Sequence, residues 1–163
     1  AFSGMDTIMA ALVAEAAGTP SYEFASERDE VARRVLLEAW GGHGLTEARC
    51  HADAREGAAT EETSVDVWTC TAECVKHSRR GHADPRERAA AFVALDQSLD
   101  YVRARAPRVV IIENVCDQLL AERVGVAVSR IGGYRWRHID LGPRELGGAM
   151  DRERAFWIGT RLL

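Results

Sequence analysis

The stretch Val109-Val110-Ile111-Ile112-Glu113-Asn114-Val115 decides the fold class of this chain. Its first four residues are apolar and β-branched, which is typical of a strand that is covered on both faces. A carboxylate and an amide follow directly, where burial costs free energy unless the polar groups are hydrogen-bonded or used in chemistry. The alternative interpretation of Glu113 is a cap of the helix that follows. The stretch therefore predicts a buried strand with a candidate site at its exit.

Blocks of helical and strand periodicity alternate on both sides of this stretch. Helical spacing of apolar residues covers 5–17, 29–40, 85–107 and 117–131, and strand-like runs cover 21–26, 65–71, 134–141 and 155–163. Asp29 and Pro85 are suited to the start of two of these helices. Alternating strands and helices of this length predict an α/β fold with a doubly wound, mostly parallel sheet.

Each predicted helix has an apolar face that is expected to point inward. The inward residues are expected to be Ile8, Met9, Leu12, Val13 and Ala16 in the first helix, Val31, Val35, Leu36 and Ala39 in the second, Phe92, Leu95, Leu99 and Val102 in the third, and Leu120, Val124, Val128 and Ile131 in the fourth.

Length and charge limit the classes of protein that remain. The 163 residues fit one domain whose core needs no disulfide or metal. No stretch approaches the ~20 apolar residues of a membrane span, and no signal peptide is expected. The formal net charge of −4 excludes nucleic-acid binding through overall charge, so such binding would need a local basic patch or a second chain. The four cysteines indicate cytosolic thiols rather than disulfides.

Ligands bind beyond the carboxyl ends of the strands in a doubly wound sheet, and this rule selects four segments. The first is Phe2-Ser3-Gly4-Met5-Asp6, where a glycine and a helix N-terminus would offer N–H groups to a ligand; a simple tight turn is the alternative. The second is Glu27-Arg28-Asp29. Glu27 stands roughly twenty residues after the first glycine, which is the spacing of a carboxylate that binds ribose hydroxyls.

The third segment is the loop 71–81, and Glu113-Asn114-Val115 is the fourth. Cys74 stands in the loop close to Lys76 and His77, and positive neighbours favour the nucleophilic thiolate. The negative charge of Glu73, beside Cys74, disfavours the thiolate. A loop cysteine without chemistry is the alternative interpretation.

A zinc site is not predicted, although four residues in this region resemble ligands. These are Cys70, Cys74, His77 and His82. The linker that normally separates paired zinc ligands is missing, and Cys70 is expected to lie within a strand.

Taken in order, the segments resemble the C5-cytosine methyltransferases, enzymes that use S-adenosylmethionine to methylate carbon 5 of cytosine. Phe2-Ser3-Gly4 resembles their first cofactor motif, Glu27-Arg28-Asp29 their ribose-binding motif, and Asp53 falls at their adenine-binding aspartate. Cys74 with Ser78-Arg79-Arg80-Gly81 resembles their Pro-Cys-Gln loop, Glu113-Asn114-Val115 is their Glu-Asn-Val, and residues 148–159 resemble their Gln-x-Arg-x-Arg region. The resemblance spans essentially the whole chain.

The resemblance implies a Rossmann-like methyltransferase fold and one catalytic domain over 1–163 that lacks a target recognition domain. The Cys74 thiolate would attack carbon 6 of a flipped cytosine, Glu113 would bind the N3 and amino edge of the ring, and Arg152 and Arg154 would hold the base or the loop. The implied cofactor-binding residues are Phe2, Ser3, Gly4, Met5, Glu27, Arg28, Asp53 and Ala54, and the implied substrate-binding residues are Ser78, Arg80 and Asn114.

The sequence departs from the family pattern at Asp6, Glu73, Val75, His77 and Met150. Three functions therefore stay open. The first, which we favour, is DNA cytosine-5 methylation, with DNA as partner and recognition supplied by a second chain. The second is a compact enzyme that acts on RNA or a free nucleotide, and the third is a non-catalytic or regulatory binding module. The expected setting is restriction–modification in a bacterial, archaeal or phage-infected cytoplasm, or a nucleus if the source is eukaryotic.

Overall fold

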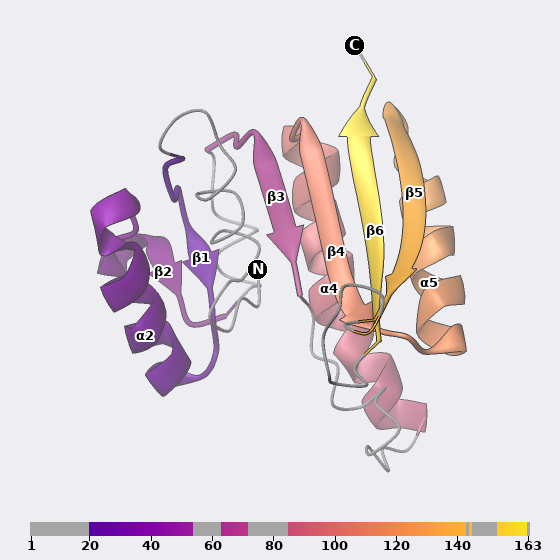
Figure 1. The fold of residues 1–163 in the computed structure, drawn as a ribbon, viewed down its shortest axis with the longest axis horizontal. Helices are drawn as coiled ribbons and strands as arrows, with labels where there is room; N and C mark the ends of the chain where they lie inside the picture. The colour runs from indigo at the N-terminus through magenta and orange to yellow at the C-terminus, as the bar shows by residue number, and fades with distance from the viewer. Residues whose placement is uncertain (1–19, 54–62, 72–84, 143, 145–152, 163) are drawn as a thin grey trace.

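The computed structural model describes residues 20–53, 63–71, 85–142, 144 and 153–162, and the statements below concern these residues. Their strands form two sheets (Figure 1). The smaller sheet pairs β1 (Ala25–Ser26) with β2 (Cys50–His51) in parallel. The larger sheet has the order β3-β4-β6-β5, with β3 at Val67–Cys70, β4 at Val109–Val115, β5 at Tyr134–Leu141 and β6 at Arg154–Arg161.

Strand directions agree with the predicted fold class. β3 and β4 are parallel, and β6 is antiparallel to both of its neighbours, β4 and β5. Hence β3, β4 and β5 run in one direction and only β6 of the larger sheet is reversed. The described part of the chain has the predicted α/β fold with a mostly parallel sheet.

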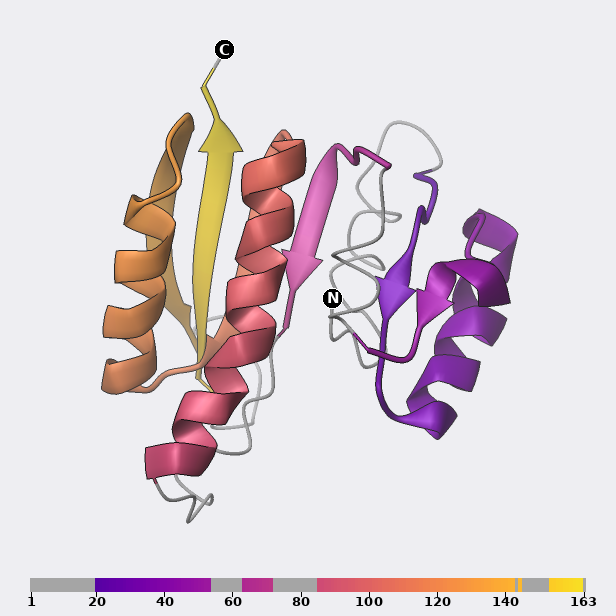
Figure 2. The same cartoon turned by 180° about the vertical axis from the view of Figure 1, so that it is seen from behind.

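Three α-helices accompany the strands: α2 (Glu30–Trp40), α4 (Pro85–Arg105) and α5 (Gln118–Ser129). Short 3-10 turns follow α2 at Gly41–His43 and precede β2 at Glu47–Arg49. Helices α4 and α5 cover the same face of the larger sheet (Figure 2). Alternate residues of β4 point to that face, so Val110, Ile112 and Asn114 are buried, while the residues between them are partly exposed. Among the described residues, no helix combines the length and the apolar character that a membrane crossing requires.

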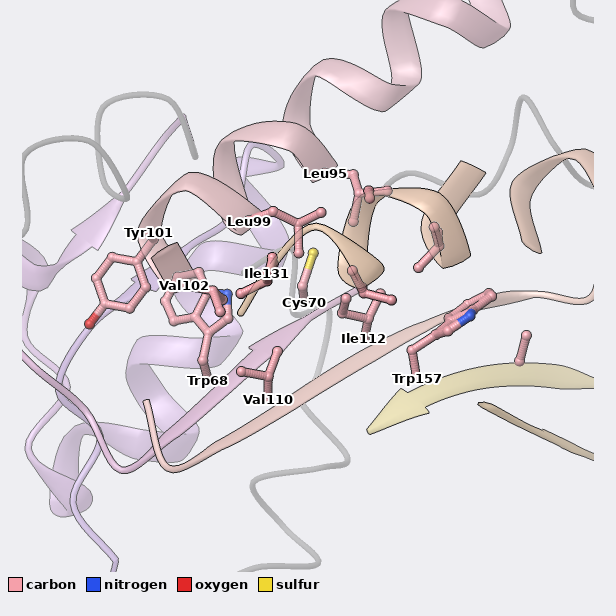
Figure 3. Packing of buried hydrophobic residues seen from close by; sticks show 14 of the residues in the cluster. Trp68, Cys70, Leu95, Leu99, Tyr101, Val102, Val110, Ile112, Ile131 and Trp157 are labelled. Atoms are coloured by element: carbon pink, nitrogen blue, oxygen red, sulfur yellow. The ribbon is translucent and has the colours of Figure 1, made fainter. Parts of the chain in front are cut away.

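The main core lies between the larger sheet and these two helices (Figure 3). It also joins the two sheets, because the Phe24 ring before β1 lies 5.4 Å from that of Trp68 and 5.5 Å from that of Tyr101. Trp68 and Tyr101 are stacked at 4.3 Å, and the Tyr101 hydroxyl donates to the Thr63 carbonyl at 2.6 Å. This aromatic group holds β1 beside β3.

Two of the predicted helix faces are confirmed. Leu120, Val124 and Val128 of α5 are buried, as is Ile131 just after this helix. Leu95, Leu99 and Val102 of α4 are buried too, and Phe92 is partly buried against the same core. The first predicted helix, 5–17, lies outside the described residues.

The predicted inner face of α2 was partly wrong. Val31 and Val35 are exposed, at 62% and 38%, and Ala39 is exposed as well, whereas Leu36 and Trp40 are buried. Among the described residues, α2 packs on the two-stranded sheet and its connections through a small cluster of Tyr22, Ala25, Leu36, Trp40, Leu45 and Cys50. This cluster buries fewer of the apolar residues of α2 than the helical spacing predicted.

The end of β4 was also predicted too early. Glu113, Asn114 and Val115 do not follow the strand but belong to it, because β6 pairs with them as far as Val115 opposite Arg154. By contrast, β1 is shorter than the strand predicted over 21–26.

Candidate functional site

An ion pair joins two of the predicted catalytic residues at the carboxyl end of β4. The register places Glu113 opposite Phe156 and Val115 opposite Arg154, so Glu113 and Arg154 are diagonal neighbours on one face. The Arg154 Nε atom lies 2.8 Å from Glu113 Oε1, and their side chains are 19% and 22% exposed. A charge pair that is largely removed from water interacts more strongly than a surface pair. The pair holds the Glu113 carboxylate, a hydrogen-bond acceptor, at the carboxyl end of β4, where a ligand is expected.

Asn114 points to the opposite face of β4 from this pair. It is 3% exposed, and its Oδ1 accepts a hydrogen bond from the backbone N–H of Val115 at 2.9 Å. This contact stabilises the end of the strand. The predicted role of Asn114 in substrate binding stays a prediction.

A second polar group near the end of β4 was missed by the sequence analysis. The Cys116 thiol lies 3.6 Å from Asp140 Oδ1, and His138 Nε2 lies 3.1 Å from the same oxygen. The His138 ring also stacks on Trp157 at 4.7 Å. The contacts of this group with Cys116 and Trp157 join segments that are distant in sequence, so no local sequence signal could have found them.

The environment of Cys116 disfavours its thiolate. Burial raises the pKa of the Cys116 thiol to about 11, with further contributions from the Asp140 carboxylate beside it. A thiol with such a pKa is a poor nucleophile at neutral pH. Cys116 is therefore unsuited to the nucleophilic role that the sequence analysis gives to Cys74.

The residues that carry the predicted cofactor carboxylates, Glu27 and Asp53, follow the two strands of the smaller sheet. Ser26 pairs with His51, and the Glu27 N–H donates to the His51 carbonyl at 3.0 Å, so Glu27 and Asp53 follow adjacent parallel strands. The arrows of β1, β2, β3 and β4 point toward the same edge of the molecule (Figure 1). The structure thus places the two carboxylates and the Glu113–Arg154 pair at the carboxyl ends of parallel strands.

The turn from β1 into α2 orients Glu27. Its Oε1 accepts the backbone N–H of Asp29 at 2.9 Å. Asp29 caps the helix as predicted, since its Oδ1 accepts the N–H of Ala32 at 2.8 Å. Arg28 lies between them and is exposed. A carboxylate with a fixed position and further acceptor capacity is suited to bind the two hydroxyls of a ribose.

The remaining predicted site residues lie outside the described part of the chain. These are Phe2, Ser3, Gly4, Met5, Ala54, Cys74, Ser78, Arg80 and Arg152. Of the four residues weighed as zinc ligands, Cys70 is buried in β3, while Cys74, His77 and His82 are also outside it. Within the described residues, no group of three or more His, Cys, Asp or Glu side chains is arranged to hold a metal ion.

No protein-family model matches the sequence, and no curated protein matches it in sequence either. Solved structures do match. The S. pombe Dnmt2 methyltransferase is 20% identical and has a TM-score of 0.67, over 98% of this chain and 49% of that one. A candidate DNA modification methyltransferase encoded within an E. coli prophage is 18% identical with a TM-score of 0.66, over 98% of this chain and 45% of that one.

A third match is PH1948 of Pyrococcus horikoshii, a candidate RNA methyltransferase, at 14% identity and a TM-score of 0.56 over 99% of this chain and 72% of that one. This chain spans about half the length of the first two structures. Because all three identities are low, the likeness establishes the fold and nothing finer. The chain has the Rossmann-like α/β fold that these methyltransferases share.

Proposed function

We propose that this chain transfers a methyl group from S-adenosylmethionine to carbon 5 of cytosine in DNA, through a covalent intermediate on Cys74. The observation that supports the proposal is the 2.8 Å contact between Arg154 and Glu113 at the carboxyl end of β4. The resemblance assigns Glu113 to the target base and Arg154 to the base or the loop. Their contact across two strands is what a shared site requires.

Each residue has a distinct part in the proposed reaction. The Cys74 thiolate adds to carbon 6 of the flipped cytosine, which makes carbon 5 nucleophilic. After carbon 5 takes the methyl group, loss of its proton restores the ring double bond and expels the Cys74 thiolate. Glu113 hydrogen-bonds the N3 and amino edge and stabilises the charge that develops on the ring. Arg154 holds the Glu113 carboxylate, and Arg152 holds the base or the loop. Extruding the base costs a few kcal/mol, which contacts to the opened DNA must offset.

The described residues suit the cofactor as well. S-adenosylmethionine supplies the methyl group when it is bound. Glu27 would hold its ribose hydroxyls and Asp53 its adenine, and both carboxylates follow adjacent strands of the smaller sheet. The first cofactor motif, at Phe2-Ser3-Gly4, would contribute the remaining contacts.

Covalent trapping tests this function. We expect the chain to form an adduct that survives denaturation with 5-fluorocytosine DNA and S-adenosylmethionine, because fluorine at carbon 5 prevents release of the enzyme. Peptide mass spectrometry should locate the adduct on Cys74, and Cys74→Ser should abolish it. Cys116→Ser is the matched control and should keep it. An adduct that persists in Cys74→Ser, or none even with candidate partner chains added, contradicts the proposal.

An RNA substrate is the second candidate. It is favoured by the match to PH1948, a candidate RNA methyltransferase, and by the absence of any DNA-reading region in the described residues. Trapping with 5-fluorocytosine RNA in parallel separates the two substrates. An adduct with RNA and none with DNA would replace DNA by RNA and leave the Cys74 chemistry in place.

A non-catalytic binding module is the third candidate, and Glu73, Val75 and Met150 favour it. Calorimetry that shows tight cofactor binding, without methyl transfer to DNA, RNA or a nucleotide, would support this role. We further propose that a second chain supplies target recognition, since the formal net charge of −4 leaves DNA binding to a local basic patch or to another chain. Methyl transfer that appears only after a neighbouring gene product is added would support such a partner.

A further inference from the structure

We infer that Arg33 of α2 is a positioning residue that holds Glu27 in place to bind the ribose hydroxyls of the cofactor. The inference rests on the proposed function, because it assumes that Glu27 binds a cofactor ribose. It concerns a residue that the family resemblance does not assign. The inference is based on one hydrogen bond, in which Nη1 of the Arg33 guanidinium donates to the Glu27 carbonyl at 2.9 Å.

Contacts on both sides fix the backbone of Glu27. On the strand side its N–H donates to the His51 carbonyl of β2 at 3.0 Å, and on the helix side its carbonyl accepts from Arg33. With both peptide groups of Glu27 fixed, the direction in which its side chain leaves the backbone is also fixed. The carboxylate is then oriented by the Asp29 N–H on Oε1 at 2.9 Å.

Arg33 reaches Glu27 from the first turns of α2. Its backbone N–H donates to the Asp29 carbonyl at 2.9 Å, which sets its side chain one turn above the cap. The hydrogen bond to Glu27 is partly buried, and a charged donor to a partly buried carbonyl is among the stronger hydrogen bonds in proteins. Arg33 therefore couples the start of the helix to the end of the strand.

The charges of Arg33 and Glu27 act on the same neighbouring thiol. Burial raises the pKa of Cys50, while the Arg33 charge lowers it and the Glu27 charge raises it. The opposed effects place both charges close to Cys50, the first residue of β2.

The chain provides a matched control in the next residue. Arg34 has the same side chain on the same helix, but it is exposed. Changing Arg34 alters the helix propensity and the net charge as much as changing Arg33 does. A difference in ligand affinity between the Arg33 and Arg34 variants therefore reports the contact of Arg33 with Glu27.

Calorimetry with two ligands tests the inference. The first ligand is S-adenosylhomocysteine, which has both ribose hydroxyls, and the second is its 2′,3′-dideoxy analogue. We expect Arg33→Met to weaken the first about tenfold, the size of one lost charged hydrogen bond, and the second less than twofold. Glu27→Gln should show the same selectivity, and the double variant should bind no more weakly than the poorer single one. Arg34→Met should bind as the unchanged protein does.

Other outcomes distinguish a failure of the role inferred for Arg33 from a failure of the proposed function. Equal weakening of both ligands by Arg33→Met would mean a purely structural role, and no weakening would make Arg33 a bystander; either result overturns the inference. If Arg33→Met does not fold, Arg33→Lys replaces it, and its selectivity for the ribose ligand decides in the same way. Failure of the unchanged chain to bind S-adenosylhomocysteine would instead remove the proposed function. Binding that depends on Glu27 and not on Arg33 removes only this inference.

Discussion

Glu113 and Arg154 face each other diagonally across β4 and β6, with Arg154 Nε 2.8 Å from Glu113 Oε1. The pair lies at the end of a strand whose alternate residues are buried against α4 and α5. The sheet therefore holds a carboxylate at the carboxyl end of β4, and the Arg154 guanidinium offsets its charge. Rigid placement of a charged group before substrate arrives is what electrostatic catalysis needs.

Removing Arg154 should destabilise the fold more than removing an exposed arginine. We expect Arg154→Gln to lower the free energy of unfolding by about 1–3 kcal/mol, because it removes the guanidinium that pairs with the largely buried Glu113 carboxylate. Urea unfolding monitored by circular dichroism measures the change. The double variant Glu113→Gln/Arg154→Gln should recover part of the loss, since no charge is then left uncompensated.

The control for this prediction is Arg108, which lies 3.8 Å from Asp66 with both side chains more than two-thirds exposed, at 72% and 80%. An exposed pair contributes little, so Arg108→Gln should change the unfolding free energy by less than about 0.5 kcal/mol. Equal losses in the Arg154 and Arg108 variants would show that the Glu113 contact adds no stability.

Glu113→Gln should remove most of the proposed methyl transfer. The amide matches the carboxylate in shape but lacks its charge, and losing one group that stabilises developing charge costs about 10²–10³-fold in rate. Initial rates of tritiated methyl transfer to cytosine-containing DNA measure the effect. Arg137→Gln, at an exposed position of β5, should leave the rate unchanged. A Glu113→Gln enzyme with full activity, beside an inactive Cys74→Ser, would exclude a catalytic role for Glu113.

The sequence predicts those parts of the structure that depend on neighbouring residues. The helical spacing of Leu120, Val124, Val128 and Ile131 depends only on the helix itself, so α5 and its buried face could be predicted. The Asp29 cap is equally local. The resemblance also assigned Glu113 and Arg154 to one site.

The unpredicted features depend on contacts between distant segments. Neither the end of β4 nor the contact of Glu113 with Arg154 is encoded near either residue, because both follow from the β4–β6 register. The same holds for Cys116 beside Asp140, which requires β5 to lie next to β6. The exposure of Val31 depends on which face of α2 packs on the described cluster around Leu36 and Trp40, and that packing is not encoded within the helix.

Cys116 should remain a thiol at pH values where an ordinary cysteine ionises. Its pKa of about 11 stands above the ordinary value of 9.0, chiefly through burial and then through Asp140. At pH 8 the thiolate fraction should therefore be about 100-fold lower than that of an unperturbed thiol, and alkylation by iodoacetamide correspondingly slow. Site-resolved mass spectrometry measures the rate at Cys116. Asp140→Asn should accelerate it, because the neighbouring negative charge is gone.

The same shift has a consequence for stability at high pH. Between about pH 9 and 11 the folded chain keeps the Cys116 proton, whereas the unfolded chain releases it. Unfolding is then favoured as the pH rises, so this residue's contribution is present below pH 9 and is lost through that window. Cys116→Ser should make the loss of stability over this pH range less steep in urea titrations. An unchanged slope would contradict the raised pKa.

Gly159 of β6 should not tolerate a side chain. A Cβ atom there would lie 2.6, 2.7 and 2.9 Å from three ring carbons of Trp136, which no real Cβ contact allows. Trp136 sits opposite Gly159 in the register of β5 and β6, so the ring covers the glycine directly. We expect Gly159→Ala to lower the free energy of unfolding by about 1–3 kcal/mol through this overpacking. Chemical denaturation measures the change.

Two further variants separate the steric cause from a general effect of replacing glycine. A Cβ at Gly125, in α5, meets nothing within 4 Å, so Gly125→Ala should stabilise the chain by about 0.5–1 kcal/mol through helix propensity. Trp136→Leu should reduce the cost of Gly159→Ala, because the clashing ring is removed. If Gly159→Ala costs the same in the Trp136→Leu variant as in the unchanged chain, the cause lies in the backbone of β6 and not in the ring that covers it.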